Sequence, residues 1–595
     1  MATEAISRPG SGDRLDGRRT IAALWRRAVA QPRPNPAYLV QTEEGWSEVS
    51  WEEAARRVEE LAHGLLDLGI RKGDAVAILA STRLEWALLD FALALIGAVG
   101  SPIYANSSPK DCRYILEHSE AVAVVVEDEE QRAKIEEVRG ETPRLEHVLS
   151  FADLDGLAAR GREHAARHPD AVDEAAAAID EEEIFTYIYT SGTTGPPKAC
   201  MIRHRNYYEM VAIVDRLEDF VREDDLMLLY LPLAHNFGRL MHLGGPYVGY
   251  TIALLPDPLR TAEALLEVRP TVLPSVPRVF EKVHTAMISQ FESATGVKRR
   301  LVDWSLGVGR QASPYKQQGL PLPRGLALRH ALADRLVFSK VKAKLGGRLR
   351  GGISGGAPLA QEISEFFHAL DILILEGYGL TECTSATSVN CRGAVRFGTV
   401  GRPLPGFEVA IADDGEVLIR SETVFAGYFK DEEATREVLD EDGWLRSGDV
   451  GELDEDGFLR ITDRKKDIIV TAGGKNVAPQ NLENALKSSS LVSQALVVGD
   501  RRRYVAALIT LEEAEAAKLT EEQRLARVQA IVDDVNRELS RFEQIKRFAI
   551  LPRDFSAEEG EVTPTMKLKR RVCEQHFADE IEALYAAPKE EAAAS

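Results

Sequence analysis

The chain has 595 residues, about four times the roughly 150 residues expected of one domain, so two or more domains are expected. Hydrophobic residues make up 45% and charged residues 28% of the chain, which excludes a fibrous or wholly disordered protein. The formal net charge of −21 argues against a general nucleic-acid binder, because such proteins hold phosphates with an excess of Lys and Arg.

The five cysteines are odd in number, widely spaced and without a CxxC pair, so neither a disulfide framework nor a zinc ribbon is expected. This usage favours a reducing, cytoplasmic location. The N-terminus lacks the apolar core of a signal or anchor, and residues 1–18 are expected to be disordered. The most apolar window, about 91–104, contains two glycines and a proline, and it is too short to span a membrane, so we expect a buried helix running into a strand.

The first strongly patterned helix follows Ser50, which with Glu53 forms a capping-box pattern, and Gly69 stands where a C-cap glycine would. Apolar runs at 75–80 and 121–126 enclose a helical stretch at about 84–97, which is typical of a βαβ unit in a parallel sheet. The alternation continues through runs at 184–189, 226–231, 251–256 and 371–379. We therefore expect one large, multi-layered α/β domain over residues 19–462.

Residues 285–345 are rich in Lys and Arg within this acidic chain. A solvated pair of helices is the favoured interpretation, and a surface for an anionic ligand or anionic lipid is the alternative. After residue 462 the pattern restarts with shorter elements. This indicates a separate small α+β domain over 463–585, followed by a tail at 586–595.

The strongest local motif is TSGTTGPPK at 190–198, which directly follows an apolar strand. Glycines let backbone N–H groups approach a polyphosphate, hydroxyls donate to its oxygens or reach Mg²⁺, and the lysine adds positive charge. An ordinary polar turn is the competing interpretation. The candidate residues are Thr190, Ser191, Gly192, Thr193, Thr194, Gly195 and Lys198.

Three further motifs carry groups suited to nucleotide chemistry. EGYGLTE at 376–382 exposes Tyr378 for stacking on a flat base and Glu382 as a hard oxygen ligand for Mg²⁺. Asp449 of SGDVG could accept hydrogen bonds from two vicinal ribose hydroxyls. Lys567, in a polar loop of the small domain, is a mobile charge that could neutralise a carboxylate and a phosphate together.

In this order, the motifs resemble those of the adenylate-forming (AMP-binding) superfamily, and they are most similar to long-chain fatty acyl-CoA synthetases. The resemblance spans nearly the whole chain and rests on SGGAPL (354–359), EGYGLTE (376–382), GEVLIR with GYF (415–429), GWLRSGDVG (443–451), GFLRITDRKKDIIVTAGGKNVAP (457–479) and TPTMKLKR (563–570). It implies an adenylation domain joined by a hinge to a small mobile domain.

The resemblance also implies roles for individual residues. Lys567 and Glu382 would be catalytic, with Glu382 and Thr194 on Mg²⁺, His235 at the acyl pocket and Asp463 at the hinge. The implied CoA-binding residues are Gly473, Gly474 and Lys475. Besides the loop at 190–198, the implied ATP- and AMP-binding residues are Gly355, Gly356, Ala357, Gly377, Tyr378, Gly379, Thr381, Asp449 and Arg464.

The implied reaction joins a long-chain fatty acid to CoA through acyl-AMP, with ATP and CoA as co-substrates. Alternatives are a ligase for medium-chain, aryl or other acids, an acyl-AMP ligase serving a carrier protein, or an idle nucleotide- or lipid-binding module. Many relatives carry an acidic residue at the position of Asn481, so no role is transferred to that side chain. No nucleic-acid partner is expected, while peripheral membrane contact and a homo-oligomer stay open.

Overall fold

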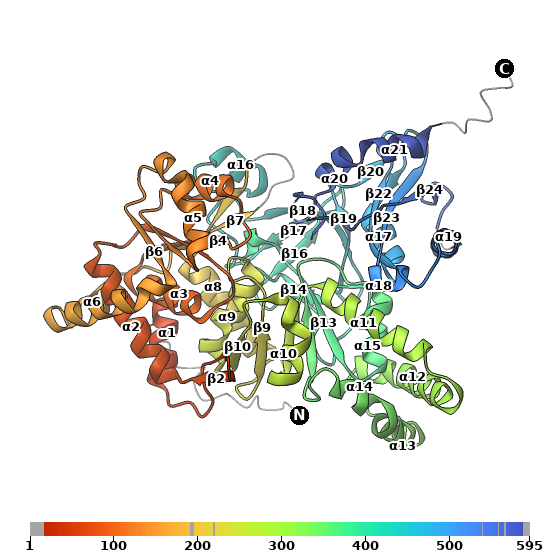
Figure 1. Cartoon of the computed structure of the whole chain (residues 1–595), viewed down its shortest axis with the longest axis horizontal. Coiled ribbons are helices and arrows are strands. Elements are labelled where there is room, and N and C mark those ends of the chain that lie inside the picture. Colours follow the sequence, from red (N-terminus) through yellow and green to blue (C-terminus); the bar gives the residue numbers. More distant parts are fainter. Residues whose placement is uncertain are drawn as a thin grey trace.

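The computed structural model describes residues 17–190, 196–217, 220–537, 539–556, 559–563 and 567–586. The predicted disordered start at 1–18 and the tail at 586–595 fall almost wholly outside these ranges. The chain forms a large α/β N-terminal part and a small C-terminal α+β part, as predicted (Figure 1).

A six-stranded sheet forms one layer of the large domain. Its strands, in spatial order, are β6 (His147–Ser150), β5 (Ala123–Val126), β3 (Ala75–Ala80), β4 (Val99–Tyr104), β7 (Ile184–Thr190) and β8 (Lys198–Arg203). All neighbours are parallel except β7 and β8, which are antiparallel and bring Thr190 opposite Lys198. Every residue of β3 is buried, because a parallel sheet is covered on both faces.

A nine-stranded sheet forms a second layer. Its order is β15 (Arg402–Pro403), β14 (Ser388–Val389), β13 (Leu373–Tyr378), β12 (Gly351–Ser354), β11 (Val272–Ser275), β9 (Leu226–Leu229), β10 (Thr251–Leu254), β1 (Tyr38–Thr42) and β2 (Gly45–Val49). Helices α8 (His204–Ala212) and α9 (Asn236–Val248) contribute side chains to the cavity described below. Since β12 and β13 are parallel, their carboxyl ends place the SGGAPL and EGYGLTE motifs at one edge.

The predicted elements of the first 130 residues are confirmed with small shifts in their ends. Helix α2 spans Trp51–Asp67, and the Ser50 side chain accepts a hydrogen bond from Glu53 N at 3.1 Å, which is one half of the expected capping box. Helix α3 spans Leu84–Ile96 and ends at Gly97, whose φ of +70° lies in the left-handed region. It runs through two residues into β4, so the apolar window near 91–104 is a buried helix and strand. No helix within the described ranges is long and apolar enough to cross a membrane.

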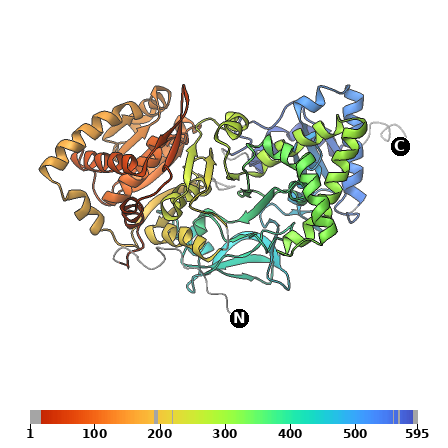
Figure 2. The same cartoon turned by 90° about the horizontal axis from the view of Figure 1, so that it is seen from below.

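The basic segment is helical, as predicted. It contains the end of α11 (Pro277–Glu292), α12 (Gly296–Gln317), α13 (Arg324–Ala333), a π-helical turn at Asp334–Phe338 and α14 (Ser339–Ala343). In Figure 2 these green helices lie at the end of the molecule opposite the N-terminal helices.

A four-stranded antiparallel sheet leads into the small domain: β16 (Glu408–Ile411), β17 (Glu416–Arg420), β18 (Leu445–Leu453) and β19 (Leu459–Arg464). The small domain then has a short hairpin of β20 (Ile469–Val470) and β21 (Asn476–Val477), and a sheet of β22 (Val492–Val498), β23 (Val505–Leu511) and β24 (Ile545–Ile550). Its helices include α17 (Pro479–Lys487), α19 (Glu521–Arg537), α20 (Arg570–His576) and α21 (Ala578–Tyr585). Separate apolar clusters on the two faces of the β22–β24 sheet give this domain its own core.

Candidate active site

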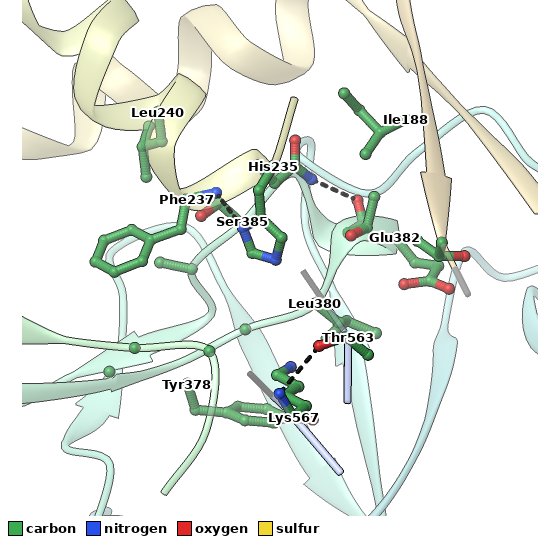
Figure 3. Close-up of a pocket in the computed structure, with 18 of the residues that line it drawn as sticks. Ile188, His235, Phe237, Leu240, Tyr378, Leu380, Glu382, Ser385, Thr563 and Lys567 are labelled. Carbon is green, nitrogen blue, oxygen red and sulfur yellow. Dashed lines mark hydrogen bonds between the residues drawn. The ribbon is translucent and has the colours of Figure 1, made fainter. Parts of the chain in front are cut away.

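A cavity of about 1530 Å³ lies where the large and small domains meet (Figure 3). Its walls come from strands β7, β12, β13, β18 and β19, from helix α9, and from the small-domain loop around residue 567. The volume exceeds what one drug-sized ligand needs, so the cavity could hold a nucleotide and a second substrate together.

Lys567 reaches into this cavity from the small domain. Its backbone N donates to Thr563 Oγ1 at 3.0 Å, and Thr563 N donates to the Lys567 carbonyl at 2.7 Å (Figure 3). Burial and the charge of Arg464 lower the pKa of Lys567 to about 8, while Asp449 and Glu382 act in the opposite direction. The cavity therefore holds a cation that an incoming anion would stabilise.

Tyr378, Asp449 and Arg464 form one polar group on the wall. The Tyr378 hydroxyl donates to Asp449 Oδ2 at 2.6 Å, and Arg464 Nε lies 3.4 Å from Asp449 Oδ1. Strands β18 and β19 pair Asp449 directly with Arg464, so the sheet register fixes this ion pair. Burial raises the pKa of Asp449, although the neighbouring Arg464 opposes the shift. Asp449 and Tyr378 both line the cavity, so the carboxylate can accept hydrogen bonds from a ligand bound there.

Glu382 also lines the cavity, and its carboxylate is held by Tyr428, a residue that was not predicted from the sequence. Tyr428 donates its hydroxyl to Glu382 Oε1 at 2.7 Å, and Lys198 Nζ lies 4.9 Å from the Tyr428 ring centroid. Tyr428 belongs to the GYF string at 427–429, one of the ordered motifs, which was the only signal available. Tyr428 therefore contacts both Lys198 and Glu382.

Small residues form the floor of the cavity. Gly355, Gly356, Gly377 and Gly379 all line it, whereas Ala357 does not. A Cβ at Gly379 would lie 1.5 Å from the Ser385 carbonyl oxygen, so this close backbone approach requires glycine. Thr381 also lines the cavity, and its carbonyl accepts from Asn236 Nδ2 at 3.3 Å.

His235 caps helix α9 and points into the cavity. Its Nδ1 accepts from Phe237 N at 3.1 Å (Figure 3), and burial, reinforced by the Lys567 charge, lowers its pKa to about 3. The ring is therefore neutral at physiological pH and is unsuited to act as an acid. His235 lines the cavity, and its place at an acyl pocket stays a prediction.

Beyond His235 the cavity extends as an apolar arm between α8 and α9. The side chains lining the arm share aliphatic or thioether character and include Met210, Val211, Val214, Leu240, Met241 and Val248. Figure 3 shows Leu240 on the far side of His235 from Lys567. These residues were not predicted, because no spacing signal separates a tunnel wall from an ordinary helix core.

Several predicted residues lie away from the cavity or outside the described ranges. Gly473, Gly474 and Lys475 form an exposed turn between β20 and β21 and do not line the cavity. Asp463 is buried behind the wall, where its Oδ2 accepts from Gln480 N at 3.2 Å. Ser191, Gly192, Thr193, Thr194 and Gly195 lie outside the described residues, while Thr190 and Lys198 at the ends of that loop line the cavity.

A dedicated metal cage is absent from the part of the chain that the structure describes: no three His, Cys, Asp or Glu side chains gather there. A cage is not needed for Mg²⁺ bound to phosphates, which keeps several waters and takes one or two protein carboxylates. Glu382 fits that requirement, because it lines the cavity and Tyr428 donates its hydroxyl to Oε1, the other carboxylate oxygen being Oε2.

Comparison with known proteins agrees with this geometry. Residues 24–429 match the family model of AMP-binding enzymes, and residues 466–589 match the model of the AMP-binding enzyme C-terminal domain. The chain is 40% identical over 588 residues to the Mycobacterium bovis long-chain-fatty-acid–CoA ligase FadD15, covering 93% of this chain and 95% of that protein. It is 31% identical to the Xenopus laevis long-chain-fatty-acid–CoA ligase ACSBG2, covering 95% of this chain and 84% of that protein.

The solved structures share the fold. A Mycobacterium tuberculosis fatty acyl CoA synthetase has a TM-score of 0.62 and 24% identity, covering 94% of this chain and 99% of that one. The anthranilate CoA ligase AuaEII, in complex with anthranoyl-AMP, has a TM-score of 0.73 and 21% identity, covering 95% and 98% of the two chains. Together with the two family matches, these findings establish that the chain belongs to the family of AMP-binding enzymes.

Proposed function

We propose that the chain is an ATP-dependent long-chain fatty acid–CoA ligase, which forms acyl-AMP and pyrophosphate and then acyl-CoA and AMP. The observation that carries the proposal is one cavity in which Lys567, Asp449 and Glu382 meet at the mouth of an apolar arm. The names of the 40% and 31% identical relatives support the same substrate class.

In the first step a carboxylate oxygen attacks the α-phosphorus of ATP, and the bond from that phosphorus to the pyrophosphate oxygen breaks. Lys567 would neutralise the incoming carboxylate and the charge growing on the α-phosphate. Asp449 would accept hydrogen bonds from the ribose hydroxyls, with Arg464 beside it. The base would lie on the glycine floor against Tyr378, and Lys198 with the loop at 190–195 would hold the pyrophosphate.

Mg²⁺ is part of this proposal. Glu382 would hold it together with Thr194, and the ion would supply neutralisation of the phosphate charges. Tyr428 positions the Glu382 carboxylate by its hydrogen bond, so it acts through another residue and is a positioning residue.

In the second step the CoA thiolate attacks the acyl carbonyl carbon and AMP leaves with the carboxylate oxygen. The exposed Gly473, Gly474 and Lys475 turn would have to approach the cavity for this step, and Asp463 is the proposed hinge. Its place at the end of β19, with an amide of α17 as partner, supports that role.

The apolar arm supports an acid with a long aliphatic tail. Each buried methylene contributes roughly 0.8 kcal/mol, so a long tail needs no polar partner at its end. The side chains named as the walls of the arm carry no charge, so they offer no partner for an acid with a polar or charged tail.

The domain boundaries remain part of the proposal: residues 19–462 as the adenylation domain and 463–585 as the mobile domain. The two family matches, ending at 429 and beginning at 466, support a boundary between them. We also propose a cytoplasmic location with peripheral membrane contact. Free cysteines at all five positions support the reducing compartment.

The test is AMP and acyl-CoA formation from ATP, Mg²⁺ and CoA over fatty acids of rising chain length, with Lys567→Ala as the control. Maximal turnover with long acids, lost in the variant, is expected. Turnover only with short or aromatic acids would favour another carboxylic acid–CoA ligase. Acyl-AMP formation without transfer to CoA would favour an acyl-AMP ligase serving a carrier protein.

A further inference from the structure

Residues 296–350 form a strongly basic region at one end of an acidic protein. They contain thirteen lysines and arginines but only two aspartates, in a chain of net charge −21. Figure 1 shows α13 at the lower right edge of the molecule with α12 beside it, and Lys316 Nζ of α12 donates to His330 Nε2 of α13 at 2.8 Å. We call the exposed side of these two helices the α12–α13 face.

Only part of this charge is neutralised within the protein. Arg299 pairs with Asp303, Lys316 with Asp371, and Lys342 with Asp334 and Asp371. The exposed cations without a carboxylate partner among the described residues are Lys298, Arg300, Arg310, Arg324, Arg329, Arg335, Lys340, Lys344 and Arg348. The region therefore has positive surface charge that ion pairs with the described carboxylates do not neutralise.

The same face carries large apolar side chains in solvent. Leu328 is 76% exposed and Leu332 is 49% exposed, one helical turn apart on α13. Arg324 stands four residues before Leu328 on the same side of α13, and Arg335 follows Leu332 by three residues, in the π-helical turn that continues the helix. Val297 at 82% exposure and Trp304 occupy the outer side of α12.

Single exposed leucines are common and need no explanation, but leucines flanked by unpaired arginines on a projecting helix are a specific combination. Nucleic-acid binding would explain the cations and leave the exposed leucines without a role. A bilayer with anionic lipids satisfies both: leucines and tryptophan enter the interface while arginines stay at the headgroups. Helix α13 has only 10 residues and the 22-residue α12 is too polar to cross a bilayer, so both would lie on its surface.

We propose that the α12–α13 face docks the protein peripherally on an anionic phospholipid membrane. The choice of a membrane rests on the proposed function, because a long-chain fatty acid partitions into bilayers and would reach the enzyme from one. The docking itself is a property of the surface and does not depend on turnover.

The experiment is flotation of the full chain with vesicles of phosphatidylcholine, alone or mixed with phosphatidylglycerol. We expect binding to the mixed vesicles that weakens with salt and is about tenfold or more weaker for Leu328→Ser/Leu332→Ser and for Arg324→Glu/Arg335→Glu. Leu525→Ser and Arg541→Glu, which alter exposed residues of the small domain, are matched controls and should bind as the wild type does.

Equal binding to neutral vesicles, binding that the α12–α13 variants leave unchanged, or no vesicle binding would each overturn the proposal. Retention on nucleic acid or on an acidic protein without vesicle binding would assign the face to that partner and overturn it as well. Turnover of albumin-delivered fatty acid should be unchanged in all four variants, so loss of docking and failure of the proposed activity are read separately.

Discussion

Arg278 at the start of α11 and Glu512 after β23 form an ion pair across the two domains, with Nη2 and Oε1 2.7 Å apart. The same guanidinium donates to the Ser493 carbonyl at 2.9 Å and to its hydroxyl at 2.8 Å. Ser289, further along α11, donates to Glu515 at 2.7 Å. These contacts hold the small domain in the orientation that brings Lys567 into the cavity.

Replacing Arg278 with alanine should therefore slow acyl-AMP formation more than thioester formation. Loss of one partner of a desolvated, hydrogen-bonded charge pair costs about 2–5 kcal/mol, so ATP–pyrophosphate exchange should fall about tenfold or more. Thioester formation from supplied acyl-AMP should change less than about twofold, because that step needs Lys567 to leave.

The matched control is Arg396→Ala, which removes ion pairs to Asp454 and Asp456 within the large domain. It should leave the ratio of the two half-reactions unchanged. Equal losses in both half-reactions for Arg278→Ala would mean that the arginine stabilises the fold without selecting an orientation.

Adenylation should depend on the protonation of Lys567. The pKa is lowered to about 8, and only the ammonium form stabilises phosphate charge, so kcat/KM for adenylation should fall as the pH rises through about 8. Lys567→Arg keeps its charge at all accessible pH values and should lack this fall, although at lower activity. A fall at the same pH in the arginine variant would assign the titration to another group.

The width of the apolar arm should set the acyl preference. Leu240→Trp places a larger side chain in the arm, and we expect the best substrate to become shorter. Each methylene that can no longer be buried costs roughly 0.8 kcal/mol, or about fourfold in kcat/KM. Leu240→Ala is the control and should not favour shorter acids. An unchanged chain-length profile in Leu240→Trp would show that the tail lies elsewhere.

Glu561 should stabilise the small domain above acidic pH. Its side chain is fully buried, accepts from Arg553 through both oxygens at 2.7 Å, and has a pKa lowered to about 2, chiefly by Arg553. Because the folded-state pKa lies below the ordinary 4.5, this stability is present above pH 4.5 and lost as the pH falls toward 2.

Glu561→Gln should therefore lower the free energy of unfolding by about 1–3 kcal/mol at pH 7, with the difference from wild type disappearing near pH 2. Denaturant unfolding at a series of pH values measures this. Glu582→Gln, which alters an exposed pair with Arg502, should change stability by less than about 1 kcal/mol. A pH-independent difference for Glu561→Gln would point to packing as the cause.

The sequence predicted the strands, the order of the motifs and the cavity residues that belong to those motifs, because buried parallel strands and glycine-rich turns leave local patterns. It did not predict the Tyr428–Glu382 hydrogen bond, which joins residues 46 positions apart. It also gave no sign of Arg278 as a domain contact, since that role depends on how two separately folded parts are oriented. Gly473, Gly474 and Lys475 lie outside the cavity because of the same domain orientation, which local sequence patterns do not specify.

Strands β18 and β19 pair Asp449 with Arg464 and Val450 with Asp463. Asp449, which is proposed to bind the ribose, is therefore the neighbour of Val450, and Val450 pairs with the proposed hinge residue Asp463. A rotation of the backbone at Asp463 would therefore displace the strand that pairs with Asp449. A nucleotide bound to Asp449 would in turn restrict rotation at Asp463. The pairing of β18 with β19 would therefore couple nucleotide binding to the rotation of the small domain.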